Sequence, residues 1–245
     1  MIVAANWKMN PELSVAAKLA SDYCATSFAG VTRILFAPHP YLVPVGVRLE
    51  GSGILLGGQD CHPSASGPHT GDVSTGMLHD CGVSVVLLGH SERRADHGET
   101  SELVAAKAVQ AFSSSLSVMI CVGETLAERE AGKARVTVLE QLAISVPSTL
   151  PTTALTIAYE PVWAIGTGKV ATAVEIAEMH LGIRGWLDEA GFNQTKILYG
   201  GSVKPGNAAE IFAVPHVDGA LVGGASLIAA DFDGICAAAA DQSGF

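Results

Sequence analysis

The sequence predicts an α/β fold, a single (β/α)8 barrel over residues 1–245, with eight parallel strands inside and helices outside. Three observations lead to this prediction. Short apolar, β-branched segments recur eight times, with helix-like segments between most of them. The strand segments are continuously apolar, as in strands that are buried on both faces. Each strand-helix unit takes about 31 residues, the size of one βαβ step.

The predicted strands are spread over the whole chain. They are Ile2–Ala5, Ile34–Ala37, Ile54–Leu56, Val83–Leu88, Val118–Val122, Leu155–Tyr159, Ile197–Tyr199 and Ala220–Val222. No repeat, low-complexity tract or linker divides the series, which favours one closed barrel over two doubly wound domains.

Two of the predicted helices have defined ends. The first begins after Asn10 as its cap, with Pro11 at the first helical position. Another begins with the capping box Thr172-Ala-Val-Glu175 and stops at Gly191. The helix after the third strand is the least defined, because Cys61–Gly76 has the composition of a long polar loop.

Composition excludes several classes of protein. Hydrophobic residues make up 49% and charged residues 16%, which excludes a disordered chain. The mean hydropathy is +0.36, but the longest uncharged stretch, Leu142–Tyr159, contains Pro147 and Pro151 and does not suit a membrane span. The first residues lack a basic region followed by an apolar one, so no signal peptide is expected. We therefore expect a soluble, cytoplasmic protein.

Charge and cysteine content exclude further partners and structural features. The net charge is −10, and no basic cluster exceeds the pair Arg93-Arg94, so nucleic acid is not an expected partner. The five cysteines are odd in number and never spaced as Cys-x-x-Cys, which indicates reduced thiols rather than a disulfide framework or zinc knuckle.

Polar residues and glycines gather just past the carboxyl ends of the predicted strands. They include Asn6, Lys8, Gln59, Asp60, His90–Glu92, Gly123, Glu124, Glu160, Gly200–Ser202, Gly223 and Gly224. In a barrel these ends meet on the face where active sites form. The sequence therefore predicts an enzyme.

Glu160 is the strongest candidate for a catalytic base. It stands between Ala158-Tyr159 and Pro161-Val162-Trp163, and such apolar neighbours predict a raised pKa for its carboxyl. The alternative is a carboxylate that caps a helix or pairs with a lysine. The segment that follows has the glycines and the length of a lid with hinges. The predicted lid is Pro161, Val162, Trp163, Ala164, Ile165, Gly166, Thr167, Gly168 and Lys169.

His90 and Lys8 are candidates for groups that stabilise negative charge. His90 precedes Ser91-Glu92-Arg93, the predicted first turn of a short helix, whose dipole disfavours a charged imidazole. A neutral ring could donate a hydrogen bond to a carbonyl; alternatively, backbone groups satisfy it. Lys8 follows the first strand, so its ammonium could reach the barrel mouth or extend to solvent.

The glycines after strands seven and eight predict a phosphate site. Gly200-Gly201-Ser202 and Gly223-Gly224 allow close approach of the backbone to a ligand, although each pair alone could be a simple turn. No metal site is predicted, because no His-Glu-x-x-His is present and Asp60-Cys61-His62 is too compact to give three ligands to one ion. Cys121 could be a nucleophile, but its place inside a strand favours a packed thiol.

Six segments resemble the triosephosphate isomerase family and span the chain in order. They are Ala4–Asn10 (AANWKMN), Leu87–Arg94 (LLGHSERR), Cys121–Glu124 (CVGE), Ala158–Lys169 (AYEPVWAIGTGK), Tyr199–Val203 (YGGSV) and Leu221–Leu227 (LVGGASL). The resemblance implies that dihydroxyacetone phosphate and glyceraldehyde 3-phosphate are interconverted through an enediolate, in glycolysis and gluconeogenesis, without a cofactor.

The resemblance also implies a role for each matching residue. Glu160 would be the base and His90 the neutral group that polarises the carbonyl, while Lys8 and Asn6 would stabilise the oxyanion. The remaining residues would bind the phosphate (Gly166, Ser202, Gly223, Gly224) or support the site (Ser91, Glu92, Cys121).

Loop three, which follows the third strand, departs from the family pattern. Asp60 stands where Asn is common, and His69 and Asp72 stand where an aromatic residue and Glu are frequent. In the family this loop inserts into a second subunit, so the resemblance implies a homodimer formed through Gln59, Thr70 and Asp72.

Two other functions remain open at the level of sequence. A different phosphate-binding barrel, such as a sugar-phosphate synthase or epimerase, would keep the glycines but would not need Glu160, His90 and Lys8 together. A catalytically silent barrel that binds a phosphorylated ligand or a partner protein would lose Glu160 or His90, and both are present.

Overall fold

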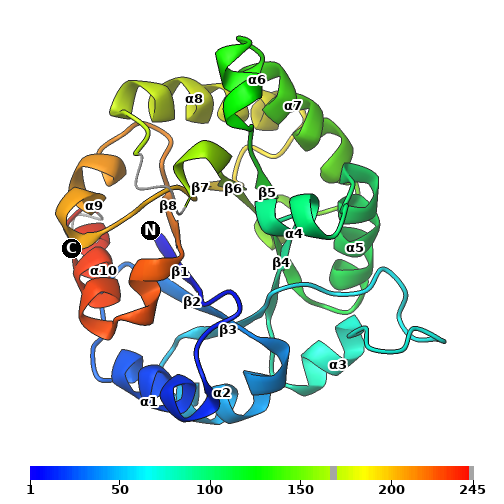
Figure 1. The fold of residues 1–245 in the computed structure, drawn as a ribbon, viewed down its shortest axis with the longest axis vertical. Coiled ribbons are helices and arrows are strands. Elements are labelled where there is room, and N and C mark those ends of the chain that lie inside the picture. Colours follow the sequence, from blue (N-terminus) through cyan, green and yellow to red (C-terminus); the bar gives the residue numbers. More distant parts are fainter. Residues whose placement is uncertain (166–169, 243–245) are drawn as a thin grey trace.

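The computed structural model describes residues 1–165 and 170–242. Its strands form one closed barrel in the order β1 to β8, with β8 pairing back onto β1 and every pair parallel. Helices surround this barrel on the outside (Figure 1). The predicted fold is confirmed. Of the predicted lid, Gly166, Thr167, Gly168 and Lys169 lie outside the described residues.

Each predicted strand overlaps one strand of the structure. The strands are β1 Ile2–Asn6, β2 Thr32–Ala37, β3 Leu55–Gly58, β4 Val85–Leu88, β5 Ser117–Val122, β6 Leu155–Tyr159, β7 Lys196–Tyr199 and β8 Gly219–Val222. The differences are confined to the ends, where pairing with a neighbouring strand rather than side-chain polarity decides the boundary.

The helices follow the strands in the expected alternation. They are α1 Leu13–Cys24, α2 Leu42–Leu49, α3 Thr75–Asp80, α4 Ser91–Asp96, α5 Ser101–Ser113, α6 Leu126–Glu130, α7 Ala134–Ser145, α8 Ala173–Glu189, α9 Pro205–Phe212 and α10 Ala229–Gln242. Single 3-10 turns add η3 Val162–Ala164 and η4 Gly224–Leu227. Among the residues that the structure describes, no helix has the length and apolarity needed to cross a membrane.

The predicted start of α1 is wrong by two residues. The helix begins at Leu13, and its cap is Glu12, whose side chain makes no capping hydrogen bond. Asn10 and Pro11 lie before it, in the connection that follows a left-handed turn at Lys8, where φ is 53°. The capping box at Thr172 and Glu175 is confirmed, and Gly191 follows the end of α8 with a φ of 86°.

The core has two layers, which explains the continuous apolar strands. In β5, Met119 and Cys121 point into the barrel, whereas Val118, Ile120 and Val122 belong to the larger cluster between strands and helices. The barrel interior is filled: a Cβ atom on Gly57 would lie 2.3 Å from the Phe36 ring. The ligand site must therefore lie at a rim of the barrel.

Candidate active site

A cavity of about 490 Å³ opens at the carboxyl ends of the strands. It brings together seven residues that were predicted from the sequence to act in catalysis or binding: Asn6, Lys8, His90, Glu160, Ser202, Gly223 and Gly224. They follow β1, β4, β6, β7 and β8, so only closure of the barrel places them side by side.

Glu160 lies at the floor of this cavity directly after β6, and its side chain is only 2% exposed. Its Oε1 is 2.9 Å from His90 Nε2, and its Oε2 accepts a hydrogen bond of 2.9 Å from the Ser91 amide. Two glycines confine it. A Cβ on Gly123 would lie 1.8 Å from the Glu160 carbonyl oxygen, and one on Gly200 would lie 2.9 Å from Glu160 Cγ.

The predicted rise in the pKa of Glu160 is wrong. Burial does raise the pKa, but the charge and hydrogen bond of His90, the Ser91 amide and the Lys8 charge outweigh it, so that the pKa is lowered. The apolar neighbours in sequence correctly predicted that Glu160 is buried. The groups that offset the effect of burial on its pKa, however, follow β4 and β1. Glu160 is therefore an anion at neutral pH.

His90 caps the N-terminus of α4. Its Nδ1 accepts a hydrogen bond of 3.3 Å from the Glu92 amide, so in the neutral ring Nε2 carries the proton and donates it toward Glu160. Burial lowers the pKa of His90, but Glu160 outweighs this effect and raises it. The prediction that the helix terminus disfavours the charged ring is thus overridden while Glu160 is in contact.

Lys8 is held over the cavity by its own backbone conformation. Its left-handed φ of 53° is unusual for a residue with a side chain. The Lys8 amide donates to Asn6 Oδ1 at 3.0 Å, and Gln59 Nε2 donates to the Lys8 carbonyl at 2.9 Å. The ammonium lies 2.5 Å from Glu92 Oε1, and its side chain is 25% exposed. Lys8 is therefore fixed at the rim of the cavity.

The glycine segments after β7 and β8 form a further part of the cavity wall. Gly200–Lys204 and Gly223–Ala225 line the cavity with backbone as well as side chains. Gly223 also packs close to Lys8, because a Cβ there would lie 3.4 Å from Lys8 Cε. Backbone of this kind can approach a phosphate closely.

The described part of the predicted lid is attached to the barrel through Trp163. Its indole Nε1 donates to Glu124 Oε1 at 2.8 Å, and the Arg129 guanidinium lies 4.8 Å from the ring centroid. Ile165 lines the cavity. Cys121 is fully buried inside the barrel, and burial raises the pKa of its thiol, so it is a packed residue rather than a nucleophile.

The residues predicted for a dimer contact are separated in loop three. Gln59 lies beside the cavity, where it bonds to the Lys8 and Phe36 carbonyls, whereas Thr70 and Asp72 are exposed. The loop between β3 and α3 projects beyond the ring of helices (Figure 1).

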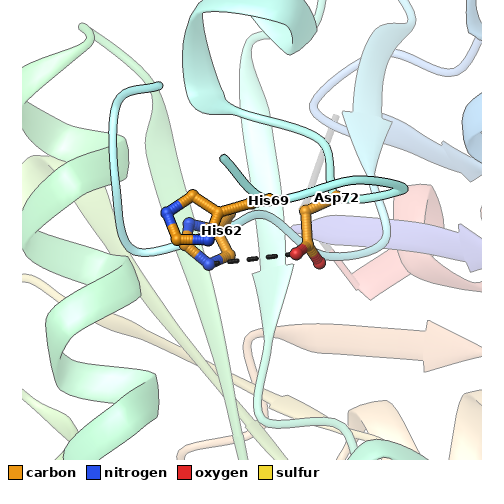
Figure 2. A group of neighbouring side chains, drawn as sticks. All are labelled: His62, His69 and Asp72. Atoms are coloured by element: carbon orange, nitrogen blue, oxygen red, sulfur yellow. Dashed lines mark ion pairs between the residues drawn. The ribbon is translucent and has the colours of Figure 1, made fainter. Parts of the chain in front are cut away.

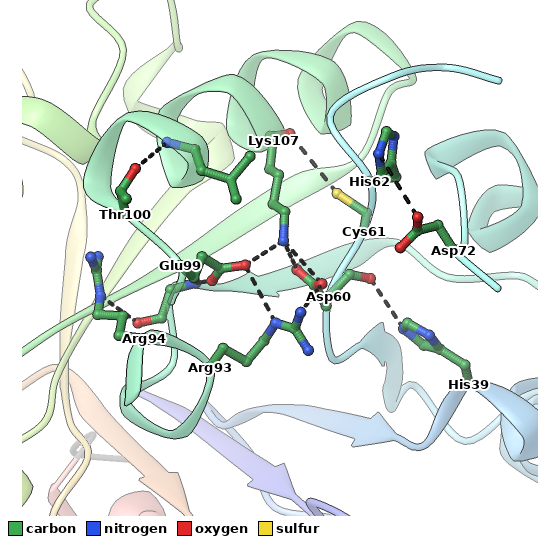
Figure 3. Close-up of polar contacts among 12 residues, drawn as sticks. His39, Asp60, Cys61, His62, Asp72, Arg93, Arg94, Glu99, Thr100 and Lys107 are labelled. Atoms are coloured by element: carbon green, nitrogen blue, oxygen red, sulfur yellow. Dashed lines mark hydrogen bonds and ion pairs between the residues drawn. The ribbon is translucent and has the colours of Figure 1, made fainter. Parts of the chain in front are cut away.

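A buried ion cluster anchors the base of loop three (Figure 3). Asp60 Oδ1 lies 2.7 Å from Lys107 Nζ, and Arg93 lies 2.8 Å from Asp60 Oδ2. Glu99 accepts from Lys107 and from the Gly89 amide. Burial raises the pKa of Glu99, but Lys107 and Arg93 outweigh it and lower the pKa overall; for Asp60 burial prevails and raises it.

Several roles in this site were missed from the sequence. Gly123 was noted only as a strand-end residue and Gly200 as part of the phosphate site, yet both confine Glu160. Gln59 holds the Lys8 backbone, and Glu124 holds Trp163. Their common signal was their place after a strand; the partner of each lies in the segment that follows another strand.

Comparison with known proteins agrees with this geometry. A family model described as triosephosphate isomerase matches residues 1–239. The chain belongs to the triosephosphate isomerase family. A triosephosphate isomerase from Ruegeria pomeroyi is 51% identical over 247 aligned residues, covering 99% of this chain and 98% of that protein. One from Caulobacter vibrioides is 51% identical over 237 residues, covering 94% and 93%.

A solved structure supports the same assignment. The crystal structure of triosephosphate isomerase from Bartonella henselae superposes with a TM-score of 0.90 at 40% identity, covering 97% of this chain and 98% of that one. The resemblance found in the sequence is confirmed, and with it the prediction of an isomerase that acts on triose phosphates. A different phosphate-binding barrel or a silent one is not favoured.

Proposed function

We propose that this chain interconverts dihydroxyacetone phosphate and D-glyceraldehyde 3-phosphate with Glu160, His90, Lys8 and Asn6 as its catalytic residues. One observation carries the assignment of roles. A buried carboxylate, an imidazole that presents an N–H and an ammonium all face one cavity lined by glycine backbone. That combination suits proton removal next to a carbonyl, and it needs no cofactor.

The proposed reaction moves one proton between neighbouring carbons. The Glu160 carboxylate removes a proton from the hydroxymethyl carbon of the ketose, and the electron pair of that C–H bond forms the enediolate. His90 Nε2–H and the Lys8 ammonium stabilise the oxygen that gains charge, and Asn6 supports it. Glu160 then returns the proton to the adjacent carbon, while His90 relays a proton between the two oxygens. Atoms and charge balance without a co-reactant.

The pKa shifts suit this sequence of events. Without substrate, His90 and the Ser91 amide stabilise the Glu160 anion and lower its pKa. A substrate oxygen that takes the His90 hydrogen bond removes part of this stabilisation, and burial then strengthens Glu160 as a base. The pKa of His90 falls for the same reason, because Glu160 is what raises it.

The phosphate would bind opposite the base. We assign it to the backbone of Gly223 and Gly224, to Ser202, and to Gly166 of the lid, which lies outside the described residues. Binding energy from this non-reacting group can hold the lid closed and exclude water from the enediolate.

A coupled isomerase assay tests the catalytic roles. Wild type should turn over both triose phosphates, and Glu160→Asp, which withdraws the carboxylate by one methylene, should lower kcat about 10²-fold. Glu140→Asp, at an exposed position, is the matched control and should behave as wild type. No turnover by wild type, or equal kcat for Glu160→Asp, would refute the assignment.

We further propose a cytoplasmic homodimer, formed through loop three with Gln59, Thr70 and Asp72 near the contact. The projection of this loop and the family's mode of assembly support the dimer, and five free cysteines suit a reducing compartment. Sedimentation equilibrium should give twice the 25.2 kDa chain mass, and a fully active monomer would contradict the proposal.

A further inference from the structure

Loop three contains three potential metal ligands that the sequence did not group. His62, His69 and Asp72 each offer one donor atom, and these atoms lie within 4.8 Å of one another. The two imidazole rings lie 3.9 Å apart at their centroids, and His62 Nε2 is 4.0 Å from Asp72 Oδ2. Figure 2 shows the three side chains pointing toward one another across the loop.

The loop backbone already holds these donors in place. The His62 amide donates to the Val73 carbonyl at 2.9 Å, and the Asp72 amide donates to the His69 carbonyl at 3.1 Å. At its base, Asp60 is fixed by Lys107 and Arg93. An ion would therefore bind to a segment that is largely ordered in advance, which limits the entropic cost of binding.

An ion pair alone does not account for this arrangement. At 4.0 Å the contact between His62 and Asp72 is too long for a hydrogen bond, and Asp72 is 56% exposed, so the pair adds little stability. Two imidazoles and one carboxylate are instead a ligand set that Zn²⁺ accepts, with water in the fourth position. The donors must move closer by about an ångström to reach Zn²⁺ bond lengths near 2.1 Å, and the exposed side chains of His69 and Asp72 can move toward the half-buried His62.

We propose that His62, His69 and Asp72 form a binding site for a first-row transition metal ion, with Zn²⁺ as its best fit. The predicted absence of a metal site was based on the lack of His-Glu-x-x-His and on Asp60-Cys61-His62, which are adjacent in sequence. The structure instead groups His62 with residues seven and ten positions later.

The His62 tautomer sets the strength of the site. His62 Nδ1 accepts a hydrogen bond of 3.0 Å from the Ser64 amide, so the neutral ring carries its proton on Nε2. Metal binding through Nε2 moves that proton to Nδ1 and opens the Ser64 contact. The site is therefore weaker than a fully preformed structural zinc centre.

A bound ion would tie residues 62, 69 and 72 together in the middle of loop three. Under the homodimer proposed above, this is the segment that reaches the second subunit. The ion would stiffen the loop there without entering the active-site cavity, which none of the three residues lines.

Calorimetric titration of the metal-free full-length protein with Zn²⁺ tests the site. We expect one ion per chain in wild type, at least tenfold weaker binding in His62→Ala and in His69→Ala, and weaker binding in Asp72→Asn. His79→Ala is the matched control, because His79 is an exposed histidine of α3 outside the cluster, and it should bind as wild type does. Co²⁺ should give a visible spectrum that the two histidine variants lose.

Two outcomes would overturn the proposal: no binding by wild type, or equal binding by wild type and both histidine variants. Thermal unfolding of the metal-free variants checks folding, and His69→Gln, which keeps a polar side chain at an exposed position, provides a second test. Because binding is measured without turnover, failure here and failure of the isomerase assay can be distinguished.

Discussion

Glu160 owes its position to residues that carry no functional group. Gly123 contacts its backbone and Gly200 contacts its side chain, so the carboxylate can stand only where His90 and Ser91 meet it. Positioning of this kind determines rate, because a displacement of about 1 Å can cost 10²-fold in turnover.

Gly123→Ala should therefore impair catalysis as well as stability. The new Cβ would lie 1.8 Å from the Glu160 carbonyl oxygen, so the end of β6 must shift. We expect kcat to fall about 10²-fold and the free energy of unfolding to fall by about 1–3 kcal/mol. Gly185→Ala in α8 is the control, since nothing lies within 4 Å of its Cβ, and it should keep wild-type kcat. Equal kcat values for both variants would contradict the positioning role.

Lys8→Ala should lower kcat while leaving the stability of the protein close to that of wild type. Removing one preorganised donor costs about 10²–10³-fold in kcat. The backbone contacts of Lys8 with Asn6 and Gln59 do not involve its side chain, so the thermal midpoint should stay close to wild type. A variant that unfolds would instead indicate a structural lysine, which circular dichroism would reveal.

At the scale of elements, the anchor of loop three joins α5 to the end of β3. Lys107 of α5 is 5% exposed and lies between the carboxylates of Asp60 and Glu99. Losing the Lys107 ammonium leaves the two carboxylates with Arg93 as the cation that they still share. Losing Asp60 removes a carboxylate whose burial already raises its pKa.

The two substitutions should therefore differ in urea unfolding. Lys107→Met should cost about 3–5 kcal/mol, because it breaks a buried charge cluster. Asp60→Asn should lower the free energy of unfolding by less than Lys107→Met does, because relieved burial partly offsets the lost attraction to Lys107 and Arg93. Equal losses in both variants would show that Asp60 and Lys107 act only as a pair.

The elements themselves could largely be predicted from the sequence, and the distances between them could not. Apolar runs located all eight strands because both faces of each strand are buried. The start of α1 was predicted two residues too early, because the helix has Glu12 and not Asn10 at its N-cap position. The pKa directions of Glu160 and His90 were wrong because each is set mainly by the other across the barrel.

The candidate site, too, could be predicted from the sequence only in part. Strand-end residues were correctly placed around one cavity, since closing a barrel brings its strand ends together. The roles of Gly123 and Gly200 depend on how closely neighbouring strands approach, which no pattern within one segment encodes.

At the scale of the whole molecule, stability in acid depends on His180. This histidine of α8 is fully buried, its Nδ1 lies 2.9 Å from the His216 carbonyl oxygen, and its Nε2 has no partner among the described residues. Burial lowers its pKa to about 4. The native state therefore keeps a neutral ring that the unfolded chain would protonate near pH 6.5.

Stability should fall as the pH drops through this window. Between pH 6.5 and 4 the unfolded state binds more protons at His180, so the free energy of unfolding decreases by about 3 kcal/mol from this residue. Urea unfolding from pH 7 to 4 measures the slope. His180→Gln should flatten the slope, whereas the exposed-site variant His79→Ala should keep it. An unchanged slope in His180→Gln would assign the acid sensitivity to other groups.

The left-handed backbone at Lys8 makes the turn after the first strand a place where activity and stability compete. A side chain in this conformation costs about 1–2 kcal/mol, and glycine adopts it freely. Selection for thermal endurance alone would therefore favour glycine here, at the expense of the ammonium that faces the cavity. Lysine occupies this position despite its cost in stability. A more heat-stable variant that keeps the ammonium must therefore gain its stability at positions other than residue 8.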